Sequence, residues 1–142
     1  MFNAFRSYLY PTYFPVEFEP KADNRGMFVE LSKARIAGQS SFSTTRPGIV
    51  RGNHYHTRKI ERFCVIKGEA IIRLRRLLSK EVIEYKVTGA RPSYVDMPTY
   101  YTHSIENIGL DELVTMFWIN EIFDPKDPDT FPEPVVIEAA NN

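Results

Sequence analysis

Residues 48–68 read GIVRGNHYHTRKIERFCVIKG, and this stretch contains two of the three histidines of the chain. Between its two bounding glycines, His54 and His56 are two residues apart, and Glu61 follows after four further residues. Side chains two residues apart on a β-strand point to the same face, so we expect both imidazoles on one side of a strand. Glu61 is expected on the next strand, facing them across a short turn. The third histidine of the chain, His103, lies much later in the sequence.

Three imidazoles and one carboxylate form a ligand set for a divalent metal. Zinc suits this set, and iron, manganese or nickel suit it nearly as well, because affinity alone separates these metals poorly. Expansion beyond four ligands would leave room for a substrate oxygen or water, which Lewis-acid chemistry requires. The alternative is that the histidines are ordinary polar residues of a half-buried sheet. The complete pattern favours a metal site made of His54, His56, Glu61 and His103.

The rest of the chain consists of short strand-like runs separated by glycine and proline, without sustained helical periodicity. We therefore predict an all-β sandwich or small barrel. The expected strands cover residues 27–33, 40–45, 50–55, 63–66, 70–76, 82–87, 93–96, 103–107 and 113–122. A length of 142 residues with 43% hydrophobic content predicts one domain, residues 1–142.

The two ends of the chain differ in composition from the middle. Residues 1–20 are rich in Phe and Tyr, and we expect this aromatic arm to pack on the barrel or on a second subunit. Residues 124–142 form a proline-rich tail, which should be extended and lie on the surface or against a partner.

Charge and composition exclude several functions. The charges of eighteen basic and eighteen acidic residues cancel. Binding to nucleic acid or to an anionic membrane would require a clear excess of basic residues, so the composition argues against both. The sequence shows neither the pattern of a signal peptide nor the run of roughly 20 apolar residues that a membrane span requires. We therefore expect a cytoplasmic protein. The single cysteine, Cys64, cannot form an internal disulfide, and its apolar neighbours indicate a packing role.

These spacings resemble the two sequence motifs of the cupin superfamily. The first motif is matched at every specified position, by Gly48, His54, His56, Glu61 and Gly68. The second motif is matched by Pro98, His103 and Asn107, but Tyr100 stands where the family usually has glycine. The gap from Gly89 to Pro98 is also longer than the motif allows, so we expect the turn before His103 to be built differently. The resemblance implies a cupin jelly roll, or double-stranded β-helix, with the metal inside.

Two further segments are similar to the dTDP-4-dehydrorhamnose 3,5-epimerases. Residues 23–30, DNRGMFVE, match their D-x-R-G-x-F-x-E stretch, and RGNH at 51–54 matches their R-G-x-H segment. This resemblance implies that Arg51 binds substrate. Those epimerases are metal-free, and His56 and Glu61 replace a Gln and a Lys of that family, so the same scaffold carries a metal site here.

A closer resemblance covers most of the chain, from YLYPTYF to FDPKDPDTFPEP. It links the chain to the C-terminal cupin half of bifunctional capsular-polysaccharide enzymes of the CapF family. The resemblance implies zinc on the four ligands and epimerisation at carbon 3 of a UDP-linked 2-acetamido-2,6-dideoxy-4-keto sugar. An NADPH-dependent reductase domain or chain would perform the next step, because this sequence has no Gly-rich dinucleotide fingerprint. Cupins of this kind commonly pair through N-terminal strands, which implies a homodimer.

Inversion of a carbon centre requires an acid and a base on two sides of the sugar ring. Tyr101 lies two residues before His103 and is expected to point the same way, which makes it a candidate for proton transfer. The alternative for Tyr101 is packing in the core. Tyr55, between two inward-facing ligands, is expected to point outward. Three further cations could meet the diphosphate, namely Arg58, Lys59 and Arg62.

Two other functions fit the same ligands. A cupin dioxygenase would use non-haem iron to activate oxygen, and a non-catalytic sugar-binding module would hold its metal for structure alone. Iron in the purified protein and oxygen consumption would indicate the dioxygenase. Sugar binding without exchange of solvent deuterium into the sugar would indicate the binding module.

Overall fold

The computed structural model describes residues 17–34 and 38–137, and these ranges contain eleven strands and no helix. The strands are β1 (Lys21–Asp23), β2 (Gly26–Ala34), β3 (Gly38–Thr45), β4 (Val50–Tyr55), β5 (Glu61–Lys67), β6 (Glu69–Arg76), β7 (Ile83–Thr88), β8 (Tyr94–Met97), β9 (Tyr101–Asn107), β10 (Leu113–Ile119) and β11 (Phe131–Pro132). The predicted all-β class is confirmed. Each of the nine expected strands corresponds to an observed one.

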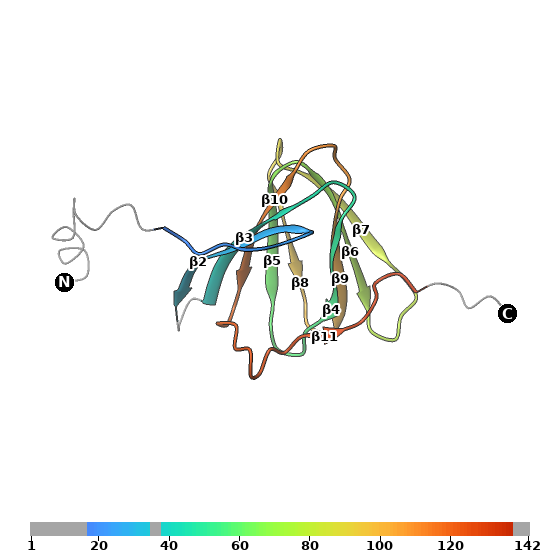
Figure 1. Cartoon of the computed structure of the whole chain (residues 1–142). Coiled ribbons are helices and arrows are strands. Elements are labelled where there is room, and N and C mark those ends of the chain that lie inside the picture. The colour runs from blue at the N-terminus through green and yellow to red at the C-terminus, as the bar shows by residue number, and fades with distance from the viewer. Residues whose placement is uncertain (1–16, 35–37, 138–142) are drawn as a thin grey trace.

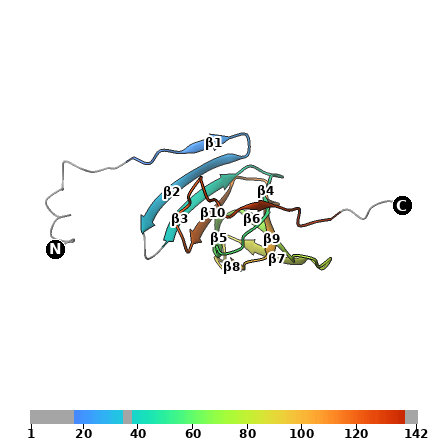
Figure 2. The ribbon, with the colours of Figure 1, turned by 90° about the horizontal axis from the view of Figure 1, so that it is seen from below.

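The strands form two sheets in which all paired neighbours run antiparallel (Figure 1). The larger sheet has the order β1-β2-β3-β10-β5-β8, and the smaller one has the order β11-β4-β9-β6-β7. Strands distant in sequence are therefore neighbours in space, as in the pairs β3·β10 and β4·β9. This arrangement is the jelly roll that the cupin motifs implied. Seen from below, β1 and β2 extend the larger sheet past the edge of the barrel (Figure 2).

The hydrophobic core lies between the two sheets and is built from alternate residues of their strands. Its buried members are Phe63, Val65, Ala70, Ile72, Leu74, Met97, Ile105 and Leu113. His103 is two residues before Ile105 on β9 and is fully buried. The strand period therefore directs this histidine into the barrel together with the core.

The described part of the proline-rich tail, residues 124–137, runs across one end of the barrel (Figure 1). Its strand β11 pairs with β4 through Phe131 and Tyr55, whose rings stack 5.2 Å apart. Tyr55 is partly buried in this stack. Farther along the tail, the buried Arg75 of β6 donates hydrogen bonds to the carbonyls of Pro134 and Val135.

The expected aromatic arm, residues 1–20, lies outside the described residues except for its last four. Within the described ranges, none of the structure forms a helix with the length and apolarity of a membrane span. Cys64, on β5, is a free thiol and is only partly buried.

Candidate metal centre

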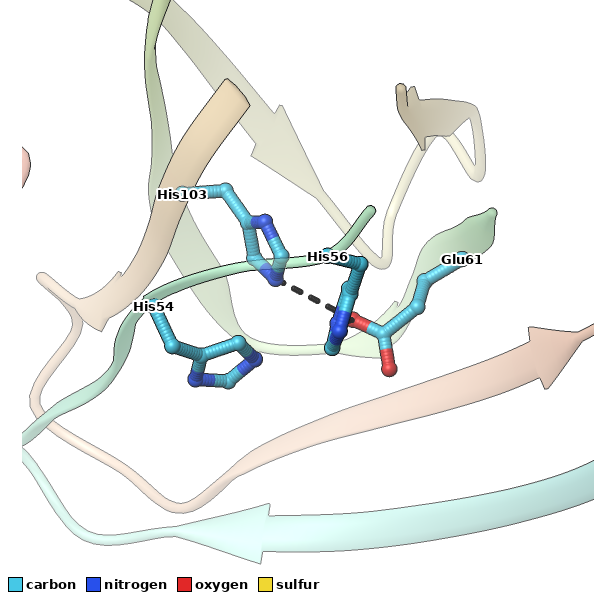
Figure 3. Close-up of side chains that lie close together, drawn as sticks. All are labelled: His54, His56, Glu61 and His103. Carbon is cyan, nitrogen blue, oxygen red and sulfur yellow. Dashed lines mark hydrogen bonds and ion pairs between the residues drawn. The ribbon is translucent and has the colours of Figure 1, made fainter. Parts of the chain in front are cut away.

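Three neighbouring segments bring the four predicted ligands together (Figure 3). His54 is on β4, His56 follows that strand directly, Glu61 opens β5 and His103 is on β9. The Nε2 atoms of His103 and His56 lie 3.1 Å and 3.3 Å from Oε2 of Glu61. The ring of His54 is centred 4.6 Å from that of His103 and 5.0 Å from that of His56. One ligand atom from each residue lies within 4.8 Å of the others, so a single ion could contact all four.

A β-bulge in β4 brings His54 beside His103. The pairing of β4 with β9 shifts register between Gly52 and His54, so Asn53 is an extra residue on β4. Gly52 and Asn53 have φ angles of +101° and +58°, in the left-handed region. A side chain at residue 52 would meet the carbonyl oxygen of His103 at 2.6 Å, so only glycine allows this close approach.

Two of the imidazole rings, those of His56 and His103, are oriented by hydrogen bonds that their Nδ1 atoms make to main-chain carbonyls. Nδ1 of His56 donates to the main-chain carbonyl of Asp129, and Nδ1 of His103 donates to that of Tyr101 at 3.3 Å. When Nδ1 carries the proton, Nε2 of a neutral imidazole carries the lone pair that a metal binds. Both rings therefore present Nε2 to Glu61 and to the centre of the site.

The electrostatics of the cluster keep its carboxylate charged. Burial alone would raise the pKa of Glu61, but the contacts of its carboxylate with the His103 and His56 rings outweigh burial and hold it far below its ordinary value. Burial, with a contribution from the nearby His103, lowers the pKa of His54 to about 4. At neutral pH the site thus contains an ionised Glu61 and a neutral His54, the forms that bind a cation.

A buried nitrogen atom without a hydrogen-bond partner in the described part of the chain also indicates that these residues could bind a divalent metal. Nε2 of His56 is completely buried and makes no hydrogen bond of good geometry with any residue that the structure describes, although Glu61 is near. A buried polar atom without a partner is costly, and a metal ion would satisfy it. Imidazole and carboxylate ligands in this number suit zinc and its first-row neighbours alike. The cluster is therefore a candidate metal site, and the donor set leaves the identity of the metal open.

A cavity of about 380 Å³ opens beside the cluster, and His54, His56 and Glu61 form part of its wall. This volume is in the range of small-molecule sites. One part of the wall is aromatic, with Phe28, Phe63, Phe117 and Phe123. The wall also contains cations: Lys21 on β1, Arg25 in the turn after β1, and Arg51 on β4.

Arg51 reaches this cavity with unused hydrogen-bonding capacity. Its Nη2 donates to the carbonyl of Thr44 at 3.2 Å, but its buried Nε has no hydrogen-bond partner within residues 17–34 and 38–137. Burial and the like charge of Arg25 both lower the pKa of Arg51. Arg25 already pairs with Asp23, so Arg51 is the guanidinium of this pair with a donor left for an anion. The structure thus gives the predicted substrate-binding arginine a place in the cavity wall.

The other predicted residues have different surroundings. Tyr101 is half-buried, packs against the hydrophobic core and is not among the residues lining the cavity. Arg58 pairs with Glu121 and Asp127, while Arg62 pairs with Asp96. The Nζ atom of Lys59 donates to the carbonyl of Pro128, and Lys59 lines the cavity. These three cations therefore have partners within the chain already.

The turn before His103 contains Tyr100 at the position where the cupin motif usually has glycine. The φ of Tyr100 is +62°, the left-handed conformation that glycine adopts most readily, so the turn keeps a glycine-like backbone. The amide of Tyr100 donates to the carbonyl of His56 at 2.8 Å, and its carbonyl accepts from the amide of Leu77 at 3.0 Å. These main-chain bonds hold the tyrosine in a conformation that it would otherwise avoid.

Sequence reasoning missed Asp129, Asn53 and Arg25 as parts of the site. The DNRG stretch did contain Arg25, and its match to an epimerase segment was a usable signal. Asn53 lies between a glycine and a ligand, but a bulge in β4 is visible only in the pairing register. Asp129 belongs to the proline-rich tail, and no local pattern connects it to His56.

The fold and the ligand cluster together define a cupin. Residues 21–131 match the family model of the polysaccharide biosynthesis C-terminal domain, and the chain belongs to this family. It is 39% identical over 131 residues to a UDP-2-acetamido-2,6-beta-L-arabino-hexul-4-ose reductase of Pseudomonas aeruginosa, a match that covers 92% of the chain and 35% of that protein. It is also 25% identical to the spore coat polysaccharide biosynthesis protein SpsL of Bacillus subtilis, over 76% of the chain and 78% of SpsL.

Solved structures agree with this assignment. The crystal structure of the capsular polysaccharide assembling protein CapF from Staphylococcus aureus superimposes with a TM-score of 0.88 at 44% identity. That match covers 91% of the chain and 35% of CapF, so the chain spans about a third of the length of CapF and of the Pseudomonas reductase. An oxalate decarboxylase from Lactobacillus farciminis, with a TM-score of 0.61 at 16% identity over 73% of the chain, shares the fold alone.

Proposed function

We propose that the chain is a metal-dependent epimerase that inverts carbon 3 of a UDP-2-acetamido-2,6-dideoxy-4-keto-hexose in capsular or O-antigen polysaccharide biosynthesis. The observation that carries this proposal is the cluster of His54, His56, Glu61 and His103 in the wall of a cavity that also contains Arg51. The names of the Pseudomonas and Staphylococcus relatives support the polysaccharide setting and the UDP-sugar substrate.

The chemistry begins with the acidity of the hydrogen on carbon 3, which lies next to a ketone. A zinc ion held by the four ligands would polarise the ketone oxygen and lower the barrier to proton removal by several kcal/mol. Arg51 would bind the negatively charged diphosphate through its unpaired donor and so orient the sugar, with the Arg25–Asp23 pair beside it. The phenylalanines of the wall would keep water away from the reacting carbon. Return of a proton from the opposite face then completes the inversion.

Tyr101 is our candidate for one of the two proton transfers. Its carbonyl already orients His103, and its side chain packs against the hydrophobic core. Tyr101→Phe removes only the hydroxyl and leaves that packing in place. Full epimerase turnover in Tyr101→Phe would end the proposed role, whereas loss of turnover with unchanged metal content would support it.

The relatives also suggest partners. The Pseudomonas protein is named a reductase and is about three times as long as the matched region. We propose that a reductase domain or chain uses NADPH to reduce the ketone at carbon 4 after the epimerisation. We further propose a cytoplasmic homodimer, and sedimentation equilibrium would test the dimer.

The direct test follows deuterium at carbon 3 of the UDP-linked 4-keto sugar by NMR in deuterated water, with the protein-free exchange subtracted. We expect protein-dependent exchange with inversion, and we expect its loss in His56→Ala. Sugar binding without exchange, in protein that contains metal, would instead identify a binding module. Bound iron together with oxygen consumption would identify a dioxygenase.

A further inference from the structure

Asp129 is a buried aspartate in the tail that crosses one end of the barrel, with 3% of its surface exposed. Its carboxylate accepts hydrogen bonds from three successive main-chain amides, those of Thr57, Arg58 and Lys59, at 2.9–3.0 Å. It also accepts one at 2.6 Å from the hydroxyl of Thr57. Four donors on one carboxylate fix the loop that directly follows His56.

The main chain of the same residue contacts the metal cluster. The carbonyl oxygen of Asp129 accepts the hydrogen bond from Nδ1 of His56. The carboxylate of Asp129 therefore holds residues 57–59, while its carbonyl holds the imidazole at residue 56. Both contacts act on His56, one through its backbone and the other through its ring.

The backbone of Asp129 is in a conformation that needs support. Its φ is +41°, in the left-handed region, which costs a residue other than glycine roughly 1–2 kcal/mol. The residue before it is held as well, because the carbonyl of Pro128 accepts hydrogen bonds from Nζ of Lys59 and from the hydroxyl of Thr130. Strain that is maintained by several contacts is typical of functional sites.

We propose that Asp129 is a positioning residue for the metal centre. Its carboxylate clamps the loop after His56, and this clamp holds its carbonyl where the Nδ1 proton of His56 must point, so that Nε2 faces the metal. The inference rests on the metal-binding part of the proposed function. It assigns to the tail a role in metal affinity, because partners that orient a ligand contribute about 10- to 100-fold to affinity in metal sites.

The first experiment measures zinc affinity by competition with a chelator. Asp129→Asn keeps the shape of the side chain and loses its charge, and Thr57→Val removes one hydroxyl donor to the carboxylate. We expect affinity to fall by about 10- to 100-fold in Asp129→Asn and by less in Thr57→Val. Asp127→Asn is the control, because Asp127 is an exposed aspartate of the same tail that pairs with Arg58 and touches no ligand.

A second readout does not depend on bound metal. The ¹⁵N chemical shifts of His56 in the metal-free protein report which ring nitrogen carries the proton. At a pH where the ring is neutral, we expect the Nδ1–H tautomer in the wild type and in Asp127→Asn, and a mixture of tautomers in Asp129→Asn. Asp129→Gly separates the two roles of the residue, since glycine accepts the positive φ but has no carboxylate. We expect it to lose affinity as Asp129→Asn does.

The outcomes separate this inference from the proposed function. If the wild type fails to bind zinc or another divalent metal at its histidines, the metal-binding proposal fails. If the wild type binds zinc and Asp129→Asn and Asp129→Gly bind it equally well with an unchanged His56 tautomer, the positioning role of Asp129 is overturned.

Discussion

At the scale of single residues, the cluster of four candidate ligands was predictable because strand geometry fixes which side chains face one another. His54 and His56 are two residues apart beside β4, and the two-residue period of a strand places both side chains on one face. The contact between His56 and Asp129 spans 73 residues of sequence. It depends on how the tail crosses the barrel, and no local pattern encodes such a crossing.

His54 should remain neutral over most of the acid range in the metal-free protein. Its pKa is lowered to about 4 from an ordinary value near 6.5, mainly by burial. Between these pH values the unfolded chain binds the proton and the folded chain does not, so the contribution of His54 to stability is lost as pH falls from about 6.5 towards 4. An NMR titration of the His54 ring should give a midpoint near pH 4. A midpoint above 6 would contradict this account.

The left-handed backbone conformation of Tyr100 should reduce the loss of stability that replacement by glycine causes. Tyr100→Gly relieves roughly 1–2 kcal/mol of conformational strain, whereas Tyr85→Gly, at a tyrosine of similar exposure on β7, relieves none. We therefore expect the free energy of unfolding in urea to fall by about 1 kcal/mol less in Tyr100→Gly than in Tyr85→Gly. Equal losses in the two variants would show that Tyr100 is not strained.

At the scale of elements, alternation and turn residues predicted the nine longer strands. The two that were missed, β1 and β11, have three and two residues and are too short to show a period. Their formation depends on pairing with β2 and β4. The bulge in β4 was missed for a related reason, because an extra residue is defined only against the partner strand.

Two glycines allow the contribution of this bulge to be measured. Gly48 and Gly52 both have positive φ, but a side chain at residue 48 would meet nothing within 4 Å, whereas one at residue 52 would meet β9. Gly48→Ala should cost roughly 1 kcal/mol of stability through its backbone alone. Gly52→Ala should cost clearly more and also weaken zinc binding, since it pushes β4 away from His103. Urea unfolding and metal titration of both variants test this, and equal effects would argue against the bulge.

At the scale of the whole molecule, the tail and the barrel are joined by a buried cation. Arg75 is 2% exposed and donates to Glu133 at 2.6 Å as well as to the carbonyls of Ser79, Pro134 and Val135. The proline content of the tail predicted an extended segment, but its path across the barrel depends on these bonds. The same path brings Asp129 to the metal cluster.

Removing this cation should therefore release the end of the tail. Arg75→Met leaves buried carbonyls without donors and should lower the free energy of unfolding by about 3 kcal/mol. Arg62→Met, at an exposed pair with Asp96, should cost at most about 1 kcal/mol. Urea unfolding of both variants measures the difference. A loss in Arg75→Met as small as that in Arg62→Met would contradict the anchoring role.

Diffraction from zinc-saturated crystals, recorded on both sides of the zinc absorption edge, would show whether His54, His56, Glu61 and His103 form one metal centre in this cupin. We predict one strong anomalous peak per chain, enclosed by these four side chains, and no such peak in crystals of Glu61→Ala prepared in the same way. The absence of a peak at this position in the wild type, or a peak elsewhere, would contradict the account.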